Sequence, residues 1–354
     1  ADTTTFTLED MLVSSKPGSP GALLGKMTET EGVIGDEVDF LGIKLPADVE
    51  VDVTFEGEVT ISVADVEEGT FYADANGGWM HTFALEDLAG GEYTVKIWDV
   101  TNGRSKTIGT FTVLSEVTFY DADTDVELTS IHVEDLVYIG GTAFPVDAKF
   151  KTIVIGTGIK RLADWVGVDP DTYAWTSPDF EVPHTSGGGQ KVTVEIQGKD
   201  AEGEALTIES EIKVKPIIAD GYWEYLDPDG KFYALPEGSG FIFAGNPLKI
   251  EGWGFLAGEE ATISFVDPET GDVEATAEIT DGGKADSDGD LEAVFSVPVI
   301  REYKFAKTRN IKVAGTTKDN KYTIKDVGID ALSDADAKLF IGLEPDGDLD
   351  FTWS

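Results

Sequence analysis

A corner motif that recurs three times along the chain constrains its fold more than any other feature. In each copy a glycine is followed three residues later by a large apolar residue and, ten residues beyond that, by another. The copies are Gly42, Leu45 and Phe55; Gly141, Phe144 and Val154; and Gly252, Phe255 and Phe265. Alternating apolar and polar residues follow each corner, a pattern typical of half-buried β-strands. Repeats of roughly 100 residues built this way predict tandem β-sandwiches.

The predicted fold class is therefore all-β, and 354 residues are enough for three separate cores. We expect an N-terminal strand and linker in residues 1–34, then modules at 35–116, 117–216 and 217–354. The third module includes an aromatic insertion before its corner and a C-terminal extension.

Modules one and three share a second signature, an acidic turn with a phenylalanine nine residues after its first aspartate. The two copies run from Asp74 to Phe83 and from Asp286 to Phe295. Together with the stretches GWGFLAGEEATISF, DSDGDLEAVFSVP and GGEYTVKIWD, this resembles the tandem bacterial immunoglobulin-like and TIG-like repeats of secreted surface-layer, filament and adhesin proteins. The resemblance covers most of residues 35–330. It implies immunoglobulin-like sandwiches in which the acidic turn closes a central hairpin, and modules that serve as spacers and interaction surfaces.

The charge balance excludes some partners and favours others. The chain carries 68 acidic against 26 basic residues, a net charge of −42. A field of this sign repels nucleic acid and attracts cations. Its 41% hydrophobic content predicts a folded chain. Adaptation to high salt is an alternative explanation of the acidity.

Two acidic segments are the candidate Ca²⁺ sites, because Ca²⁺ takes six to eight oxygen ligands and each segment offers four carboxylates at alternate positions. The predicted metal ligands are Asp121, Asp123, Asp125 and Glu127 between modules one and two, and Asp286, Asp288, Asp290 and Glu292 in module three. A third candidate comprises Asp346, Asp348 and Asp350. The alternative is a set of solvated turns, because Asp-Gly is itself a hairpin signal.

Nothing in the sequence predicts an enzyme. The histidines His81, His132 and His184 lack the spacing of a hydrolytic metal site, and no nucleophile elbow or phosphate-binding glycine loop occurs. The seven tryptophans could form a sugar-binding platform, but their alternating positions favour core roles.

The expected location is extracellular, at the cell surface. The chain has no cysteine, and its polar opening ADTTTF is typical of a chain after signal-peptide removal. No apolar run approaches the roughly 20 residues that a membrane span needs.

These observations predict a secreted structural protein that self-assembles into a surface layer or filament stabilised by Ca²⁺. Its partners would be copies of itself, with a surface anchor or glycan also possible. The segments TTTFTL and LDFTWS alternate as strands and could add to a sheet edge of a neighbouring copy, and we favour the N-terminal one for this exchange. The alternative is a monomeric adhesin or carbohydrate-binding module array.

Overall fold

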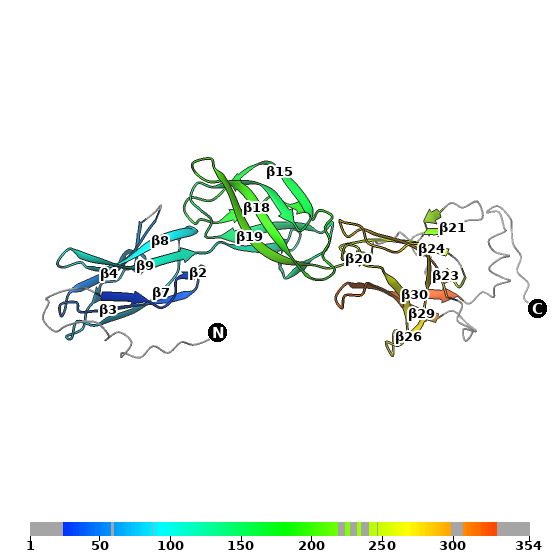
Figure 1. Ribbon diagram of the computed structural model, residues 1–354, viewed down its shortest axis with the longest axis horizontal. Coiled ribbons are helices and arrows are strands. Elements are labelled where there is room, and N and C mark those ends of the chain that lie inside the picture. The colour runs from blue at the N-terminus through cyan, green and yellow to red at the C-terminus, as the bar shows by residue number, and fades with distance from the viewer. Residues whose placement is uncertain are drawn as a thin grey trace, which may run out of the picture. The chain divides into compact units, whose positions relative to one another are not determined.

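The protein is described by a computed structural model that covers residues 24–57, 60–86, 88–218, 224–226, 232–234, 241–245, 247–298 and 307–330. Within these ranges the chain forms β-strands and one short helix, which confirms the predicted all-β class (Figure 1). The predicted N-terminal strand, the Asp346–Asp350 acids and the terminal LDFTWS segment lie outside the described residues.

The strands of module one form two sheets. One sheet has the order β1-β3-β7, and the other has the order β2-β9-β8-β4-β5 with β6 also paired to β4. The first sheet contains β1 (Leu24–Met27), β3 (Glu37–Ile43) and β7 (Trp79–Ala84). The second contains β2 (Glu31–Gly32), β4 (Glu50–Glu56), β5 (Thr60–Ser62), β6 (Phe71–Tyr72), β8 (Gly91–Asp99) and β9 (Arg104–Val113), and helix α1 (Val63–Val66) follows β5.

Module two repeats this plan with the sheet orders β11-β10-β13-β16, to which β17 adds, and β12-β19-β18-β14-β15. The first sheet contains β10 (Glu116–Asp121), β11 (Glu127–Leu128), β13 (Leu136–Thr142), β16 (Trp175–Thr176) and β17 (Phe180–Glu181). The second contains β12 (Ser130–Ile131), β14 (Lys149–Ile155), β15 (Gly158–Gly167), β18 (Lys191–Lys199) and β19 (Ala205–Val214). Strands β18 and β19 form an antiparallel hairpin.

Module three has the sheet orders β22-β21-β24-β28-β27, to which β20 adds, and β23-β30-β29-β25-β26. The first sheet contains β20 (Ile217–Ile218), β21 (Glu224–Leu226), β22 (Phe232–Ala234), β24 (Pro247–Trp253), β27 (Glu278–Gly282) and β28 (Leu291–Ser296). The second contains β23 (Phe241–Phe243), β25 (Thr262–Val266), β26 (Val273–Thr276), β29 (Lys307–Ala314) and β30 (Lys321–Asp330).

One pairing identifies the three modules as copies of a single topology. In each, a short early strand pairs in parallel with the last strand, and these pairs are β2–β9, β12–β19 and β23–β30. The other ladders of these three sheets are antiparallel.

Aromatic side chains from both sheets meet in the cores. In module one the ring of Phe55 from β4 lies 5.8 Å from that of Phe40 on β3 and 5.9 Å from that of Phe83 on β7. In module three Phe265 on β25 lies 6.4 Å from Phe295 on β28. All five side chains are buried, so the second apolar residue of the corner motif joins the two sheets.

The described chain divides into two compact units. The first holds the described residues up to Glu116 together with Gly141–Ala148 and Val168–Trp175, and the second holds the rest. The predicted boundaries at 116/117 and 216/217 stay predictions.

The corner motif has the same backbone geometry in all three modules. The residue two positions after its glycine has a left-handed φ, which is 64° at Lys44, 53° at Ala143 and 73° at Gly254. The residue six positions after it is left-handed as well, at Asp48, Asp147 and Gly258. Two such residues in one short loop turn the chain from one sheet into the other. The sequence repeat therefore corresponds to a repeated backbone conformation.

Candidate functional site

Each corner is hydrogen-bonded to an acidic turn farther along its own module. The backbone N–H groups of Leu45, Phe144 and Phe255 donate to the carbonyl oxygens of Gly77, Tyr173 and Gly289, over 3.1, 2.9 and 3.0 Å. The acceptors also have left-handed φ values, from 52° to 82°. The acidic turns are thus part of the corner.

The leading aspartate of each acidic turn caps backbone N–H groups. Oδ1 of Asp74 accepts hydrogen bonds from the N–H groups of Asn76 and Gly78, and Oδ1 of Asp286 accepts them from Asp288 and Asp290. In the equivalent turn of module two, Asp169 also caps the backbone, but it accepts from the N–H groups of the second and third following residues, Asp171 and Thr172. Such side-chain-to-backbone bonds stabilise a turn without any ligand.

The sequence reveals this turn only in modules one and three, because Tyr173 stands in module two where the others have glycine. In module one the acidic turn does not close the hairpin that the resemblance implied. There the turn connects β6 to β7, which belong to different sheets, whereas in module three it joins the paired strands β27 and β28.

The acids predicted between modules one and two lie in a hairpin turn of module two. Asp121 ends β10 and Glu127 begins β11, which pair antiparallel. Oδ1 of Asp121 accepts from the backbone N–H and the hydroxyl of Thr124, over 2.8 and 2.7 Å, and these bonds hold the pKa of Asp121 below its ordinary value. The side chains of Asp123, Asp125 and Glu127 are exposed.

The four predicted acids of module three have separate partners. Asp286 caps its turn, Asp290 binds the ring of His184, and an Oε1 atom of Glu292 lies 3.2 Å from Nζ of Lys249. The side chain of Asp288 is exposed.

No group of three histidine, aspartate or glutamate side chains converges as a metal site within the described ranges. Asp123, Asp125, Glu127 and Asp288 are the predicted ligands whose carboxylates the structure leaves open to solvent. Calcium binding at both turns stays a prediction.

The corner of module three also contacts module two, inside the second compact unit. The N–H of Gly188 donates to the carbonyl oxygen of Gly254 over 2.8 Å, and the N–H of Ala257 donates to Oγ of Ser186 over 2.8 Å. A Cβ atom on Gly188 would lie 2.6 Å from Cβ of Leu256. We call this contact, made by residues 185–190 and 254–257, the module two–three junction.

The corner of module two makes the equivalent contact inside the first compact unit. Oγ of Ser115 donates to the carbonyl oxygen of Ala143 over 2.6 Å, and a Cβ on Gly90 would lie 2.2 Å from that oxygen. The corners of modules two and three thus each pack against a glycine-containing turn of the preceding module, AGG at 89–91 and GGG at 187–189. These glycine runs are the sequence signal that could have indicated the contacts, although no prediction was based on it.

An ion-paired histidine, His184, lies next to the module two–three junction in the sequence. Nδ1 of His184 lies 2.7 Å from Oδ1 of Asp290, and Nε2 lies 3.5 Å from Oε1 of Glu134. The ring also meets that of Trp253 edge to face. Burial lowers the pKa of His184, but the two carboxylates outweigh it and raise the pKa above its ordinary value.

The same pair affects Asp290. Burial raises the pKa of Asp290, His184 lowers it, and the nearby charges of Asp286 and Asp288 raise it further, so the net shift is upward. The hydrogen-bonded ion pair is fully charged in the window between the two raised pKa values.

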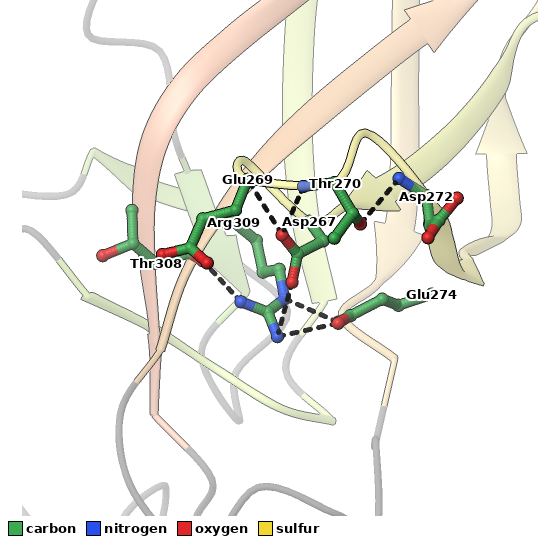
Figure 2. A network of polar contacts seen from close by, with 7 residues as sticks. All are labelled: Asp267, Glu269, Thr270, Asp272, Glu274, Thr308 and Arg309. Atoms are coloured by element: carbon green, nitrogen blue, oxygen red, sulfur yellow. Dashed lines mark hydrogen bonds and ion pairs between the residues drawn. The ribbon is translucent and has the colours of Figure 1, made fainter.

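A polar network surrounds the buried Arg309 in module three, where this residue of β29 reaches the β25–β26 turn (Figure 2). Its guanidinium contacts both oxygens of Glu274, with Nε–Oε2 at 2.5 Å and Nη2–Oε1 at 2.8 Å, and lies 3.9 Å from Asp267. Oδ1 of Asp267 in turn accepts from the N–H groups of Glu269 and Thr270. The arginine therefore ties the turn to the sheet, a structural role.

A second network fixes the loop after β29. The carboxylate of Glu259 accepts from the N–H and hydroxyl of Thr317 and from Nδ2 of Asn320, while Oδ1 of Asn320 accepts from the N–H of Leu256 in the corner. Burial raises the pKa of Glu259, but these hydrogen bonds outweigh it and lower the pKa to about 2.

All three histidines lie beside carboxylates that their spacing in the sequence did not indicate as sites. His81 lies 2.8 Å from Glu67, and His132 lies 3.3 Å from Asp135. The tryptophans divide between two roles. Trp79 and Trp175 are buried as expected, whereas Trp165 on β15 is 44% exposed. Trp223 and Trp353 lie outside the described residues.

None of the helices found in the described ranges is long and apolar enough to cross a membrane.

Neither a family model nor a curated protein matches the chain. Among solved structures, a tetra-tandem repeat from the extending region of a large adhesion protein has 13% identity and a TM-score of 0.26, over 87% of this chain and 72% of that one. The SGBP-B protein of the Bacteroides ovatus mixed-linkage glucan utilization locus, solved with a heptasaccharide, has 13% identity and a TM-score of 0.21, over 90% and 69%. A C-terminal fragment of intimin bound to its receptor domain has 12% identity and a TM-score of 0.22, over 56% and 66%.

Similarities this weak carry no inference about function. The sheet order itself defines the class of the protein: it is a tandem array of immunoglobulin-like β-sandwich modules, as the sequence motifs indicated.

Proposed function

We propose that this chain is an extracellular structural protein, a cell-surface array of immunoglobulin-like modules that self-assembles into a layer or filament. The module two–three junction is the observation that carries the proposal. Modules that act independently are joined by open linkers. Here a backbone hydrogen bond between Gly188 and Gly254 and close glycine packing join neighbours, which suits a chain that must keep its modules in register.

The charge of the chain supports a role for cations in this assembly. At −42, copies of the chain repel one another in low salt. Divalent cations bound at exposed carboxylates, such as those of Asp123 and Asp125, would reduce this repulsion and bridge copies.

Electron microscopy of the purified chain with and without Ca²⁺ tests the proposal. We expect ordered sheets or fibres in Ca²⁺ that come apart in chelator at neutral pH. A chain that stays monomeric by light scattering at every Ca²⁺ and protein concentration would refute self-assembly.

The exposed Trp165 favours a second candidate, a monomeric glycan-binding array. An indole ring open to solvent can stack on a sugar face. Glycan-array binding by the soluble monomer that Trp165→Ala abolishes would support this alternative.

A further inference from the structure

The β14–β15 hairpin carries a group of cations with no ion pair in the described structure. Lys149, Lys151, Lys160 and Arg161 approach no described carboxylate closely enough to form one, whereas Lys96, Lys191 and Lys249 do. Nζ of Lys151 instead lies 6.0 Å from the ring centre of Trp165. We call these four residues and Trp165 the cationic hairpin. In a chain with 68 acidic residues, unpaired cations on one hairpin are a local reversal of the surface charge.

The cationic hairpin lies at a sheet edge and is open to solvent. Strand β15 pairs only with β14, so its other edge is unpaired in the described structure. Ile159 is 60% exposed, and Arg161 is exposed beside it. Arg161 of β15 pairs with Thr152 of β14, and the next paired residue of β15, Val166, lies opposite Phe150. Residues 162–165 therefore form a bulge, which contains Trp165. The bulge limits the regular free edge to a short stretch near residues 158–161.

We propose that the cationic hairpin docks the acidic segment 344–353 of a second copy of this chain. The inference rests on the proposed self-assembly and supplies a contact for it. The segment reads EPDGDLDFTW, and it lies outside the described residues.

The sequence of the segment complements the hairpin. If the segment binds as an extended strand, Asp346, Asp348 and Asp350 would share one face, at intervals of about 6.6 Å. Leu349, Phe351 and Trp353 would then share the other face. A strand added at the free edge near residues 158–161 would place its acids beside Arg161, with Lys149 and Lys151 one strand farther in on β14, and its apolar side chains on the opposite face.

A second copy fits this site better than an anionic polysaccharide does, because the segment also supplies an apolar face. Polysaccharide carboxylates or sulfates would use the cations alone. Charge complementarity also places the contact where two chains of charge −42 repel each other least.

A charge-exchange binding experiment tests the docking. A fluorescent peptide of residues 340–354 is titrated with the full chain carrying E344Q, D346N, D348N and D350N, so that its own segment does not compete. We expect a saturable rise in anisotropy, and binding that weakens with salt.

Charge variants identify the binding surface. In the background of the E344Q/D346N/D348N/D350N chain, the variant K149E/K151E/R161E should bind the peptide at least tenfold more weakly. The control K106E/K191E/K213E makes the same change of charge elsewhere and should bind the peptide as before. A peptide with the four acids changed to lysine should bind K149E/K151E/R161E and not the unchanged hairpin.

The outcomes separate this inference from the proposed function. Equal loss in both charge variants, or no recovery with the lysine peptide, would overturn the docking site even if light scattering shows that the chain assembles. Peptide binding to a chain that never assembles would support the site and refute self-assembly. If the hairpin variant loses only binding to polygalacturonate and keeps peptide binding, the hairpin is a glycan site and the docking is wrong.

Discussion

The N–H of Gly188 donates a hydrogen bond to the carbonyl oxygen of Gly254, and these residues belong to consecutive sandwiches. Both have left-handed φ values, and both would carry a Cβ too close to the opposite module, Gly188 to Leu256 and Gly254 to the carbonyl of Lys215. The backbones of modules two and three are thus in direct contact, and any side chain at Gly188 or Gly254 would push them apart.

Gly188→Ala should destabilise the protein more than a left-handed alanine alone explains. The strained φ costs about 1–2 kcal/mol, and the 2.6 Å approach to Leu256 adds about 1–3 kcal/mol. Gly203→Ala is the matched control, because Gly203 is left-handed with φ 89° and a Cβ added there would have no atom within 4 Å. Denaturant unfolding of both variants measures the difference, and equal losses would show that the junction contact contributes nothing.

Arg309→Met should lower the free energy of unfolding by about 1.5–3 kcal/mol, because the partly exposed carboxylates of Glu274 and Asp267 lose their buried cation. Lys191→Met removes an exposed ion pair with Glu211 and should cost at most about 1 kcal/mol. The double variant Arg309→Met/Glu274→Gln should recover part of the loss. If Arg309→Met unfolds at the same denaturant concentration as Lys191→Met, the network does not stabilise the β25–β26 turn.

The pair of His184 and Asp290 should weaken as pH rises through the raised pKa of His184. The folded pKa of His184 is raised, so its contribution is fully present below the unfolded value of about 6.5 and is lost as pH rises through the folded value. Hydrogen exchange at residues 185–190 should therefore quicken between pH 6 and pH 8.5 beyond its intrinsic pH dependence. Asp290→Asn should remove this extra change and lower the His184 pKa measured by NMR. An unaltered His184 titration in that variant would contradict the assignment.

Glu259 should contribute to resistance against acid. Its folded pKa of about 2 lies below the reference value of 4.5, so its contribution is present above about pH 4.5 and disappears as pH falls through about 2. Glu259→Gln should narrow the difference in stability between pH 5 and pH 2.5, with exposed Glu278→Gln as the control. The same pH dependence in both variants would refute this role.

Calcium should raise the thermal midpoint if the turn between β10 and β11 binds it, by mass action on the folded state. Asp121→Asn keeps an oxygen that can accept from Thr124, so the Ca²⁺-free midpoint should hardly change. The Ca²⁺-induced rise should fall in that variant and in Asp123→Asn. If Ca²⁺ leaves the thermal midpoint of the wild-type chain unchanged, the turn does not bind Ca²⁺ and its carboxylates are only solvated.

The sequence predicted the all-β class and the three repeats, because short-range alternation and the corner motif record local conformation. It did not predict the pairing of His184 with Asp290, which are 106 residues apart, or that of Arg309 with Glu274. Such pairs depend on which modules and hairpins come together in space. The acidic turns were recognised, but their bonding to the backbone was not. One backbone conformation is encoded by glycine at 77 and 289 and by tyrosine at 173.

The parallel pairing of an early strand with the last strand in every module has a mechanical consequence. When the chain is pulled from outside a module, the early strand and the last strand are drawn in opposite directions along their shared ladder. Parallel ladder bonds then take the force together, in shear, and do not open one after another. Tension along the chain is therefore shared by all the hydrogen bonds of this ladder in each sandwich.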